Sequence, residues 1–411
     1  MGQVGNGVRH CRWGLALATL TLVAACASSG PAAVTPPSAG PDGTLTAPTA
    51  EASTAAVTVA PTTVPTTPAT TLAPTTTAPP LSPDLLAGGM VLCSFSGPAV
   101  PQWALDRLQA GLAAGLLLYR RNLASEAQAA ANGQAAQAAA LASPVALPAI
   151  VATDQEGGIV ARITGPPSAS AAAMGVRPAA DIEAEGRATA DLLLRWGVNT
   201  DLAPVADVAR PDTFEARARR SFSGDPAVAA GGVTAFVAGL RAGGVAATLK
   251  HFPGLGAASA NTDHADGVVD VPAADLDAVD LVPFRAGIAA GAQLVMVASA
   301  AYPALSPGLA LTSSTIVDGL LRGLLGFRGV VISDALDASG VGVVGTPPEA
   351  AVAAAAAGVD LFIAQGSEVC VDLQQALVVA MADGRLPVAR AQQAFDRVAE
   401  LRRALAPRPA G

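Results

Sequence analysis

Eight short apolar runs of β type, with helical patterns between them, constrain the fold of this chain more than any other feature of its sequence. The runs occupy residues 90–95, 115–119, 147–154, 198–207, 246–252, 294–302, 329–334 and 360–364. Their starts lie roughly 25–50 residues apart, which leaves room for one helix in each connection. Most runs are continuously apolar rather than alternating, as expected for parallel strands that are buried on both faces.

The segments between these runs predict helices. Residues 180–196 carry apolar side chains at helical spacing, and residues 314–325 begin with Ser and Thr, which cap helices, before Ile316. Eight β–α units in about 320 residues match the count and size of a single (βα)₈ TIM-type barrel, so we expect the α/β class. A doubly wound open sheet is the alternative, but no Gly-x-Gly-x-x-Gly follows the first run and nothing supports a dinucleotide-binding fold.

Polar residues stand at the C-terminal ends of four predicted strands. They are Asp154, Asp207, Lys250 with His251, and Asp334. In a barrel these ends converge on one mouth, where active sites are built. Lys250 is the only lysine in the chain, which uses arginine for every other cationic side chain. Either this lysine persists by chance or its position needs a compact ammonium group rather than a planar guanidinium.

The first 25 residues predict a signal peptide of the bacterial lipoprotein type. Arg9 and Arg12 precede an apolar run over residues 15–25 that is too short to span a bilayer. The run ends in Val-Ala-Ala-Cys, which resembles a lipobox, so Cys26 is the expected lipidated first residue of the mature chain. An ordinary signal peptide that happens to contain a cysteine is the alternative.

Residues 26–80 consist largely of Thr, Pro, Ala and Ser, and residues 81–411 contain the predicted barrel. The first segment cannot bury enough apolar surface to offset its ordering entropy, so it predicts a disordered tether. We therefore expect an exported monomer held on the extracytoplasmic face of the cell membrane by its lipid anchor only. A net charge of −8 argues against nucleic acid or an anionic membrane surface as a partner.

Export also bears on the cysteines. If Cys11 is removed and Cys26 is lipidated, Cys93 and Cys370 remain in a compartment that permits disulfides. A barrel closes its first strand against its last, and these two cysteines lie in the first run and shortly after the last run. We expect their Cα atoms to lie within the roughly 7 Å that a disulfide requires. Two cysteines alone do not make a zinc site, so neither a metal nor another cofactor is expected.

Five short motifs follow one another in order along the predicted barrel. They are Asp-Gln-Glu-Gly-Gly at 154–158, Ala-Pro-Val-Ala-Asp-Val at 203–208, Arg-Ser-Phe at 220–222, Lys-His-Phe-Pro-Gly at 250–254 and Val-Ile-Ser-Asp at 331–334. The set resembles the motifs of glycoside hydrolase family 3, in its single-domain β-N-acetylglucosaminidase branch, and the chain looks like an actinobacterial-type lipoprotein of that branch. The resemblance covers essentially the whole barrel, residues 85–405.

The resemblance implies roles for individual residues. Asp334 matches the nucleophile, a carboxylate that attacks the anomeric carbon to give a covalent glycosyl-enzyme; a helix N-cap is the alternative role. Ala335 replaces the family's usual second acid, and Ile159 replaces a family arginine that follows the double glycine. The residues that match sugar-binding or acetamide-binding positions are Asp154, Arg162, Arg220, Lys250 and His251. For Arg220 the alternative is a solvated charge run with Arg217 and Arg219.

The expected acid/base loop departs from the family pattern. This branch carries an Asp-x-His pair shortly after the Lys-His motif, whereas the loop here contains Asn261, Thr262, Asp263 and His264. Aligned without a gap, Asn261 and Asp263 take the Asp and His places; shifted by one, Thr262 and His264 take them. A lone imidazole has a pKa near 6.5, which suits proton transfer, so we expect His264 to serve with Asp263 or Asp266 orienting it. The alternative is an exposed loop histidine.

These residues support three hypotheses about the function. The first is a retaining exo-hydrolase that releases terminal β-linked N-acetylglucosamine from cell-wall muropeptides or related glycans. The second is a catalytically impaired relative that binds wall sugars, which the incomplete Asp-x-His pair favours. The third, a β-glucosidase-like hydrolase, is disfavoured because such members usually add a second domain that supplies the acid/base. With only 3 Trp and 2 Tyr, the chain suits a short glycan better than a polymer groove.

Overall fold

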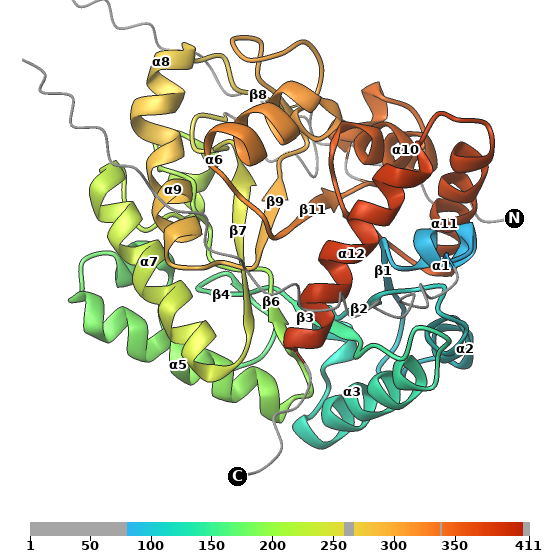
Figure 1. Cartoon of the computed structure of the whole chain (residues 1–411). Helices are drawn as coiled ribbons and strands as arrows, with labels where there is room; N and C mark the ends of the chain where they lie inside the picture. Colours follow the sequence, from blue (N-terminus) through green and yellow to red (C-terminus); the bar gives the residue numbers. More distant parts are fainter. Residues whose placement is uncertain (1–79, 259–266, 338, 406–411) are drawn as a thin grey trace, which may run out of the picture. The chain divides into compact units, whose positions relative to one another are not determined.

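The computed structural model describes residues 80–258, 267–337 and 339–405 and contains a closed barrel of eight parallel strands (Figure 1). The strands are β1 (Val91–Ser94), β2 (Gly115–Leu117), β3 (Ile150–Thr153), β6 (Thr200–Asp201), β7 (Ala246–Phe252), β9 (Leu294–Val297), β11 (Val330–Ala335) and β12 (Leu361–Ala364). The order around the barrel is β1-β12-β11-β9-β7-β6-β3-β2, with Cys93 of the first strand opposite Ala364 of the last. Each predicted run coincides with one barrel strand, so the predicted fold is confirmed.

Helices surround the strands on the outside of the barrel (Figure 1). The longer ones are α2 (Gln102–Ala110), α3 (Glu126–Leu141), α5 (Ala179–Arg195), α7 (Pro226–Gly243), α9 (Leu281–Ala289), η4 (Thr315–Leu324), α10 (Pro347–Ala357), α11 (Ser367–Ala382) and α12 (Val388–Ala404). The two predicted helices are α5 and η4, and the second is a π-helix rather than an α-helix. Helix α7 is long and apolar enough to cross a membrane, but it packs against α5 and α9 as a barrel helix.

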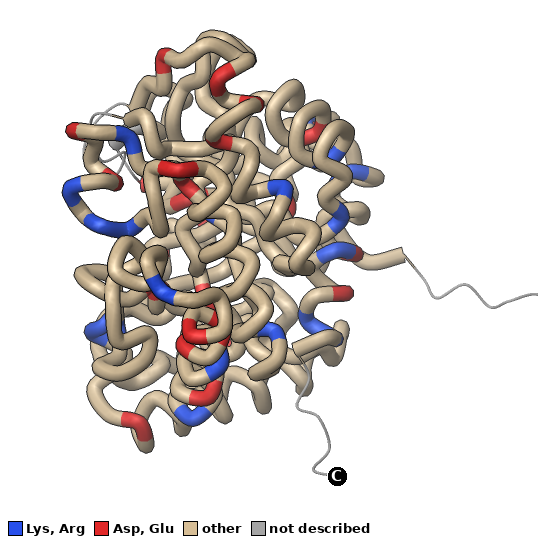
Figure 2. The backbone as a smooth tube through the Cα atoms, turned by 90° about the vertical axis from the view of Figure 1, so that its left-hand side faces the viewer, with Lys and Arg blue, Asp and Glu red and all other residues tan. Residues whose placement is uncertain are grey.

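Shorter elements complete the described chain. The helical ones are α1 (Pro83–Gly88), η1 (Arg120–Asn122), α4 (Ala171–Met174), α6 (Phe214–Ala218), α8 (Ala273–Asp275), η2 (Leu276–Asp280), η3 (Ala310–Thr312) and η5 (Ser339–Val343). Two small sheets stand apart from the barrel: the antiparallel pair β4 (Gln155–Gly157) with β5 (Val160–Ala161), and the parallel pair β8 (Gly267–Val268) with β10 (Ala300–Ala301). Acidic and basic residues are interspersed along the side of the barrel seen in Figure 2.

The barrel strands bury both faces, which explains their continuous apolar runs. In β1, Leu92 belongs to the cluster inside the barrel, whereas Val91 and Cys93 belong to the cluster between strands and helices. Helix α12 covers the N-terminal end of the barrel, where Val398 and Leu401 pack against the inner cluster. At about 25 cal/mol for each Å² of apolar surface removed from water, this two-sided burial is the main source of stability.

A charged cluster joins two helices and two barrel strands at the same end of the barrel. Asp360, fully buried just before β12, accepts hydrogen bonds from Arg322 of η4 and, at 2.9 and 3.0 Å, from Arg390 and Arg397 of α12. Its Oδ2, which accepts from Arg322, also accepts from the backbone N–H of Val331 at 2.9 Å. One carboxylate therefore links the π-helix, the last helix and two barrel strands.

A disulfide joins Cys93 of β1 to Cys370 of α11, with a Cα–Cα distance of 5.5 Å. The predicted pairing is confirmed. It links residues 277 positions apart in the chain, so it fixes the closure of the barrel near the junction of its first and last strands. Cys26, the predicted signal peptide and nearly all of the predicted tether lie outside the described residues.

Candidate active site

A cavity of about 560 Å³ lies at the C-terminal ends of the barrel strands. Small-molecule sites usually occupy about 300–1,000 Å³, so the cavity suits a ligand of one or a few sugar units. Its lining includes every described residue that the sequence assigned to nucleophilic attack or sugar binding, namely Asp154, Arg162, Arg220, Lys250, His251 and Asp334. Residues that are up to 180 positions apart in sequence therefore share one cavity because they all stand at strand ends or in the loops that follow them.

Lys250 is the centre of a buried ion-pair network in this cavity. Its Nζ donates to Oδ1 of Asp154 at 2.8 Å and lies 2.8 Å from Oε1 of Glu156, and the side chain is 3% exposed. Burial alone would raise the pKa of Asp154, but Lys250 and Arg162 outweigh it and hold that pKa below its usual value. Arg220 and Lys250 likewise lower the pKa of Glu156 against the effect of burial. A point-like ammonium between two carboxylates is the geometry that lysine provides and arginine does not.

Arg220 forms a bidentate pair with Glu156. Its Nε and Nη2 donate to Oε2 and Oε1 of Glu156, both at 2.8 Å, and its Nη1 donates to Oε1 of Glu215 at 2.9 Å. These carboxylates raise the pKa of Arg220 although burial opposes the rise. Because the side chain is only 13% exposed, Arg220 is not part of a solvated charge run.

The β4–β5 hairpin presents Asp154 and Glu156 to these cations. The two carboxylates are two positions apart in extended chain, so they point to the same side. The hairpin turns at Gly157 and Gly158, whose φ angles of +90° and +61° are unfavourable for other residues. The returning strand places Arg162 so that its Nη2 donates to Oδ2 of Asp154 at 3.1 Å.

His251 is held from behind by Asp207. The imidazole Nδ1 lies 2.8 Å from Oδ2 of Asp207, and Oδ1 accepts from the backbone N–H groups of His251 and Leu255 at 3.1 and 2.6 Å. Burial alone would lower the pKa of His251, but Asp207 outweighs it and raises that pKa above its ordinary value. Asp207 itself is fully buried and does not line the cavity. It therefore fixes the ring plane of His251, whose opposite edge is left for a ligand.

Asp334 lies in β11, half-buried, and lines the cavity. Its Oδ1 accepts from the backbone N–H of Ala335 at 2.8 Å. The strand ends one residue later, so the carboxylate stands at the mouth of the barrel, as predicted from the sequence. A carboxylate among Lys250, His251 and Arg220 in one cavity has the chemistry of a nucleophile beside groups that bind hydroxyls.

The rim of the cavity is partly aromatic and apolar. The guanidinium of Arg121 lies 4.5 Å and that of Arg162 lies 6.0 Å from the ring centre of Tyr119. Burial, followed by the nearby Asp154, raises the pKa of Tyr119, so the phenol stays neutral. Ile159 at the turn of the β4–β5 hairpin is 71% exposed and also lines the cavity. The position where the family carries an arginine therefore offers an apolar contact.

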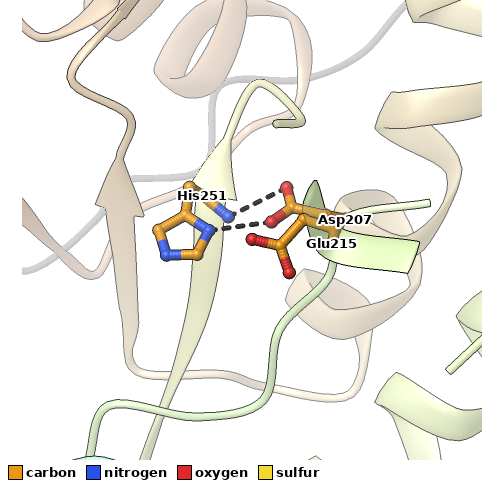
Figure 3. A group of neighbouring side chains, drawn as sticks. All are labelled: Asp207, Glu215 and His251. Carbon is orange, nitrogen blue, oxygen red and sulfur yellow. Dashed lines mark hydrogen bonds and ion pairs between the residues drawn. The ribbon is translucent and has the colours of Figure 1, made fainter. Parts of the chain in front are cut away.

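One group among the described residues has the composition of a metal site. Asp207, Glu215 and His251 each offer a ligand atom, and these atoms all lie within 4.8 Å of one another (Figure 3). Two of the three ligand atoms are already hydrogen-bonded to each other, and Glu215 is paired with Arg220. A cation placed there would meet the guanidinium of Arg220, which disfavours metal binding.

Sequence reasoning missed two acidic residues of the network. Glu156 could have been predicted from the sequence, because it stands two residues after Asp154 in a strand-like motif. Glu215 carries no comparable signal, since its pairing with Arg220 arises only when α6 folds beside the cavity. The acid/base candidates Asp263 and His264 lie outside the described residues.

Comparisons with known proteins place these residues in a family. The model of the glycosyl hydrolase family 3 N-terminal domain matches residues 99–401. The chain is 40% identical over 266 residues to a beta-hexosaminidase of Xylella fastidiosa. The aligned region covers 62% of this chain and 77% of that protein. It is 42% identical over 255 residues to a beta-hexosaminidase of Xanthomonas campestris pv. campestris. That aligned region covers 60% of this chain and 75% of that protein.

Solved structures give the same result. A glycoside hydrolase family 3 beta-N-acetylglucosaminidase from Paenibacillus superposes with a TM-score of 0.76 and 30% identity, covering 81% of this chain and 64% of that one. This chain thus spans just under two thirds of that protein. A beta-N-acetylhexosaminidase from Beutenbergia cavernae superposes with a TM-score of 0.72 and 32% identity, covering 79% of this chain and 99% of that one.

Proposed function

The chain belongs to glycosyl hydrolase family 3 and is a glycosidase, and from this premise we propose that it is a retaining exo-enzyme that releases terminal β-linked N-acetylglucosamine. The observation that carries the proposal is the convergence of Asp334 and five polar side chains on one cavity of about 560 Å³. The similar proteins that are named beta-hexosaminidases or beta-N-acetylglucosaminidases support N-acetylglucosamine as the sugar. For the natural substrate we propose cell-wall muropeptides or related glycans.

In the proposed mechanism Asp334 attacks the anomeric carbon, the bond to the leaving oxygen breaks, and a covalent glycosyl-enzyme forms. Water, which gives a proton to the acid/base, then attacks the same carbon, the bond to Asp334 breaks, and the sugar leaves with its original anomeric configuration. Asp154, with Lys250 and Arg162 fixing its two oxygens, accepts hydrogen bonds from sugar hydroxyls. Lys250 and His251 also contact sugar hydroxyls, and their orientation is set by Asp154, Glu156 and Asp207 before the sugar binds.

The experiment is turnover of 4-nitrophenyl glycosides. We expect hydrolysis of the N-acetyl-β-glucosaminide and much slower hydrolysis of the β-glucoside. Asp334→Ala is expected to abolish turnover while circular dichroism stays unchanged, and Asp383→Asn, at an exposed carboxylate 42% accessible, is the control with wild-type activity. A wild-type protein that binds the sugar without turnover would favour the second candidate, a wall-sugar-binding lipoprotein, which the incomplete Asp-x-His pair supports. Preferred hydrolysis of the β-glucoside would favour the β-glucosidase-like alternative.

For the acid/base we propose His264, oriented by Asp263 or Asp266. Loss of the proton donor slows hydrolysis most for substrates whose leaving group must be protonated before it can depart. His264→Ala is therefore expected to keep its glycosylation rate with a 2,4-dinitrophenyl glycoside and to lose about 10²–10⁴-fold with an unactivated disaccharide. Azide is expected to rescue the second half-reaction. Equal activity of variant and wild type on the disaccharide would exclude this role.

We further propose that the protein is exported and held on the extracytoplasmic face of the membrane by lipid on Cys26. The disulfide supports export, because such bonds persist in oxidising compartments and are rare in the cytosol. The expected result is detergent-dependent extraction of the wild type and release of Cys26→Ala as a soluble protein. A wild type secreted in soluble form, with another N-terminal residue, would contradict the proposal.

A further inference from the structure

Glu215 has a buried oxygen without a partner just behind the candidate active site. The residue lies in α6 and is 1% exposed. Its Oε1 accepts from Arg220 at 2.9 Å, whereas its Oε2 makes no hydrogen bond with any residue that the structure describes. A buried carboxylate oxygen that lacks a donor is destabilising, because its hydration is lost without replacement. A hydrogen-bond partner for this oxygen is therefore expected nearby.

The neighbour is a second carboxyl group. Ligand atoms of Glu215, Asp207 and His251 lie within 4.8 Å of one another, and Figure 3 shows the carboxyl of Glu215 beside that of Asp207. Asp207 is itself an acceptor only, since it receives the imidazole Nδ1 and two backbone N–H groups. The charge of Asp207 disfavours a second negative charge on Glu215, and a proton on Glu215 would supply the donor that this pair of acceptors lacks.

We propose that Glu215 is a positioning residue that acts as a carboxylic acid: its protonated Oε2 donates a hydrogen bond to Asp207 while its Oε1 accepts from Arg220. One side chain then links Arg220 to the Asp207–His251 pair and fixes the positions of Arg220 and His251. The inference rests on the proposed function in one respect, because Arg220 and His251 are the residues assigned to the sugar.

The charges around Glu215 agree with this state. Burial raises the pKa of Glu215 to about 7, although Arg220 opposes the rise; Asp207 adds to it and His251 reduces it. The titratable and charged groups that face Glu215 are Asp207, His251, Arg220 and Glu156. Below about pH 7 the link is intact; above it Glu215 ionises, the proton between the carboxyls is lost, and a second negative charge stands beside His251.

The key variant is Glu215→Gln, because an amide reproduces the protonated acid at every pH. Its N–H₂ donates toward Asp207 and its carbonyl accepts from Arg220. We expect kcat/KM of Glu215→Gln to equal that of the wild type within about threefold at about pH 6, and to lack a decline above about pH 7 that the wild type shows. Glu215→Leu, similar in size but unable to bond, is expected to lose about 10²-fold at all pH values through misplacement of Arg220 and His251.

A second readout separates this inference from the proposed function, since it needs no substrate. The folded pKa of Glu215 lies above its unfolded value, so the wild type loses stability as pH rises between the two values, and Glu215→Gln does not. The urea midpoint of the wild type is therefore expected to fall relative to that of Glu215→Gln between about pH 5 and about pH 8. Glu215→Leu is not needed for this comparison if it fails to fold.

Three results would overturn the proposal. One is a midpoint difference between the wild type and Glu215→Gln that stays constant over this range, as for a permanently ionised partner of Arg220. Another is a Glu215→Gln enzyme as inactive as Glu215→Leu. The third is loss of wild-type activity in EDTA with recovery on added Zn²⁺, which would put a metal ion rather than a proton between the carboxyls.

Discussion

Replacement of Lys250 by methionine tests the network that underlies the candidate site. Methionine keeps the length and most of the volume of the side chain but removes the ammonium, which lies 2.8 Å from each of Asp154 and Glu156. Removing one member of a buried ion pair typically costs about 3–5 kcal/mol of unfolding free energy. Because Arg162 still pairs with Asp154 and Arg220 with Glu156, we expect a loss near the lower value, about 3 kcal/mol.

The loss should depend on pH in a defined direction. Lys250 helps to lower the pKa of both carboxyls, so its contribution is present above their unfolded values near 4 and is lost as pH falls through the folded values. The difference in unfolding free energy between variant and wild type is therefore expected to be largest above about pH 5 and to shrink as the pH falls below about 4.

The assay is urea unfolding followed by circular dichroism at several pH values. Arg385→Met is the matched control, because it removes a cation from an exposed pair with Asp383, 54% and 42% accessible, and water already screens that pair, so the loss of stability should be much smaller. A loss at Lys250 no greater than the control, or one that does not vary with pH, would refute the buried network as described.

Two further predictions concern the barrel itself. Asp360→Asn leaves Arg322, Arg390 and Arg397 without their shared carboxylate and should lower the unfolding free energy by about 3–5 kcal/mol. Since this cluster stands at the opposite end of the barrel, kcat below the unfolding transition should not change, and a specific loss of kcat would be inconsistent with it. Reduction of Cys93–Cys370 should lower the unfolding free energy by about 2–5 kcal/mol in a titration with and without reductant. An unchanged urea midpoint after complete reduction would contradict that contribution.

The barrel could be predicted from the sequence because its strands bury both faces and so appear as unbroken apolar runs. Strand ends were less well predicted: the run over 198–207 holds only a two-residue strand, β6, because the chain beyond it keeps only an isolated bridge, between Val205 and Lys250, to the neighbouring strand β7. The π-helical form of η4 was not predictable, because helical spacing does not distinguish i→i+4 from i→i+5 bonding.

The candidate site was predictable where chemistry and strand ends coincide. Asp154, Lys250, His251 and Asp334 stand at such ends, and the structure brings them to one cavity. Asp207 stands at a similar position but turns inward to hold His251, a difference that depends on tertiary packing. One partner of the buried charges, Glu215, meets Arg220 only when α6 folds beside the cavity, and this contact leaves no pattern in the sequence.

The most direct test of the account is to trap the covalent intermediate. A 2-acetamido-2-deoxy-5-fluoro-β-glucosyl fluoride keeps the acetamide, while the ring fluorine slows both steps and the good leaving group lets the first proceed, so the glycosyl-enzyme accumulates. Mass spectrometry of the peptic digest should find one added sugar on the peptide that contains Asp334, and none in Asp334→Ala. An adduct on another residue, or rapid release of product with inverted configuration, would contradict Asp334 as the nucleophile of a retaining glycosidase.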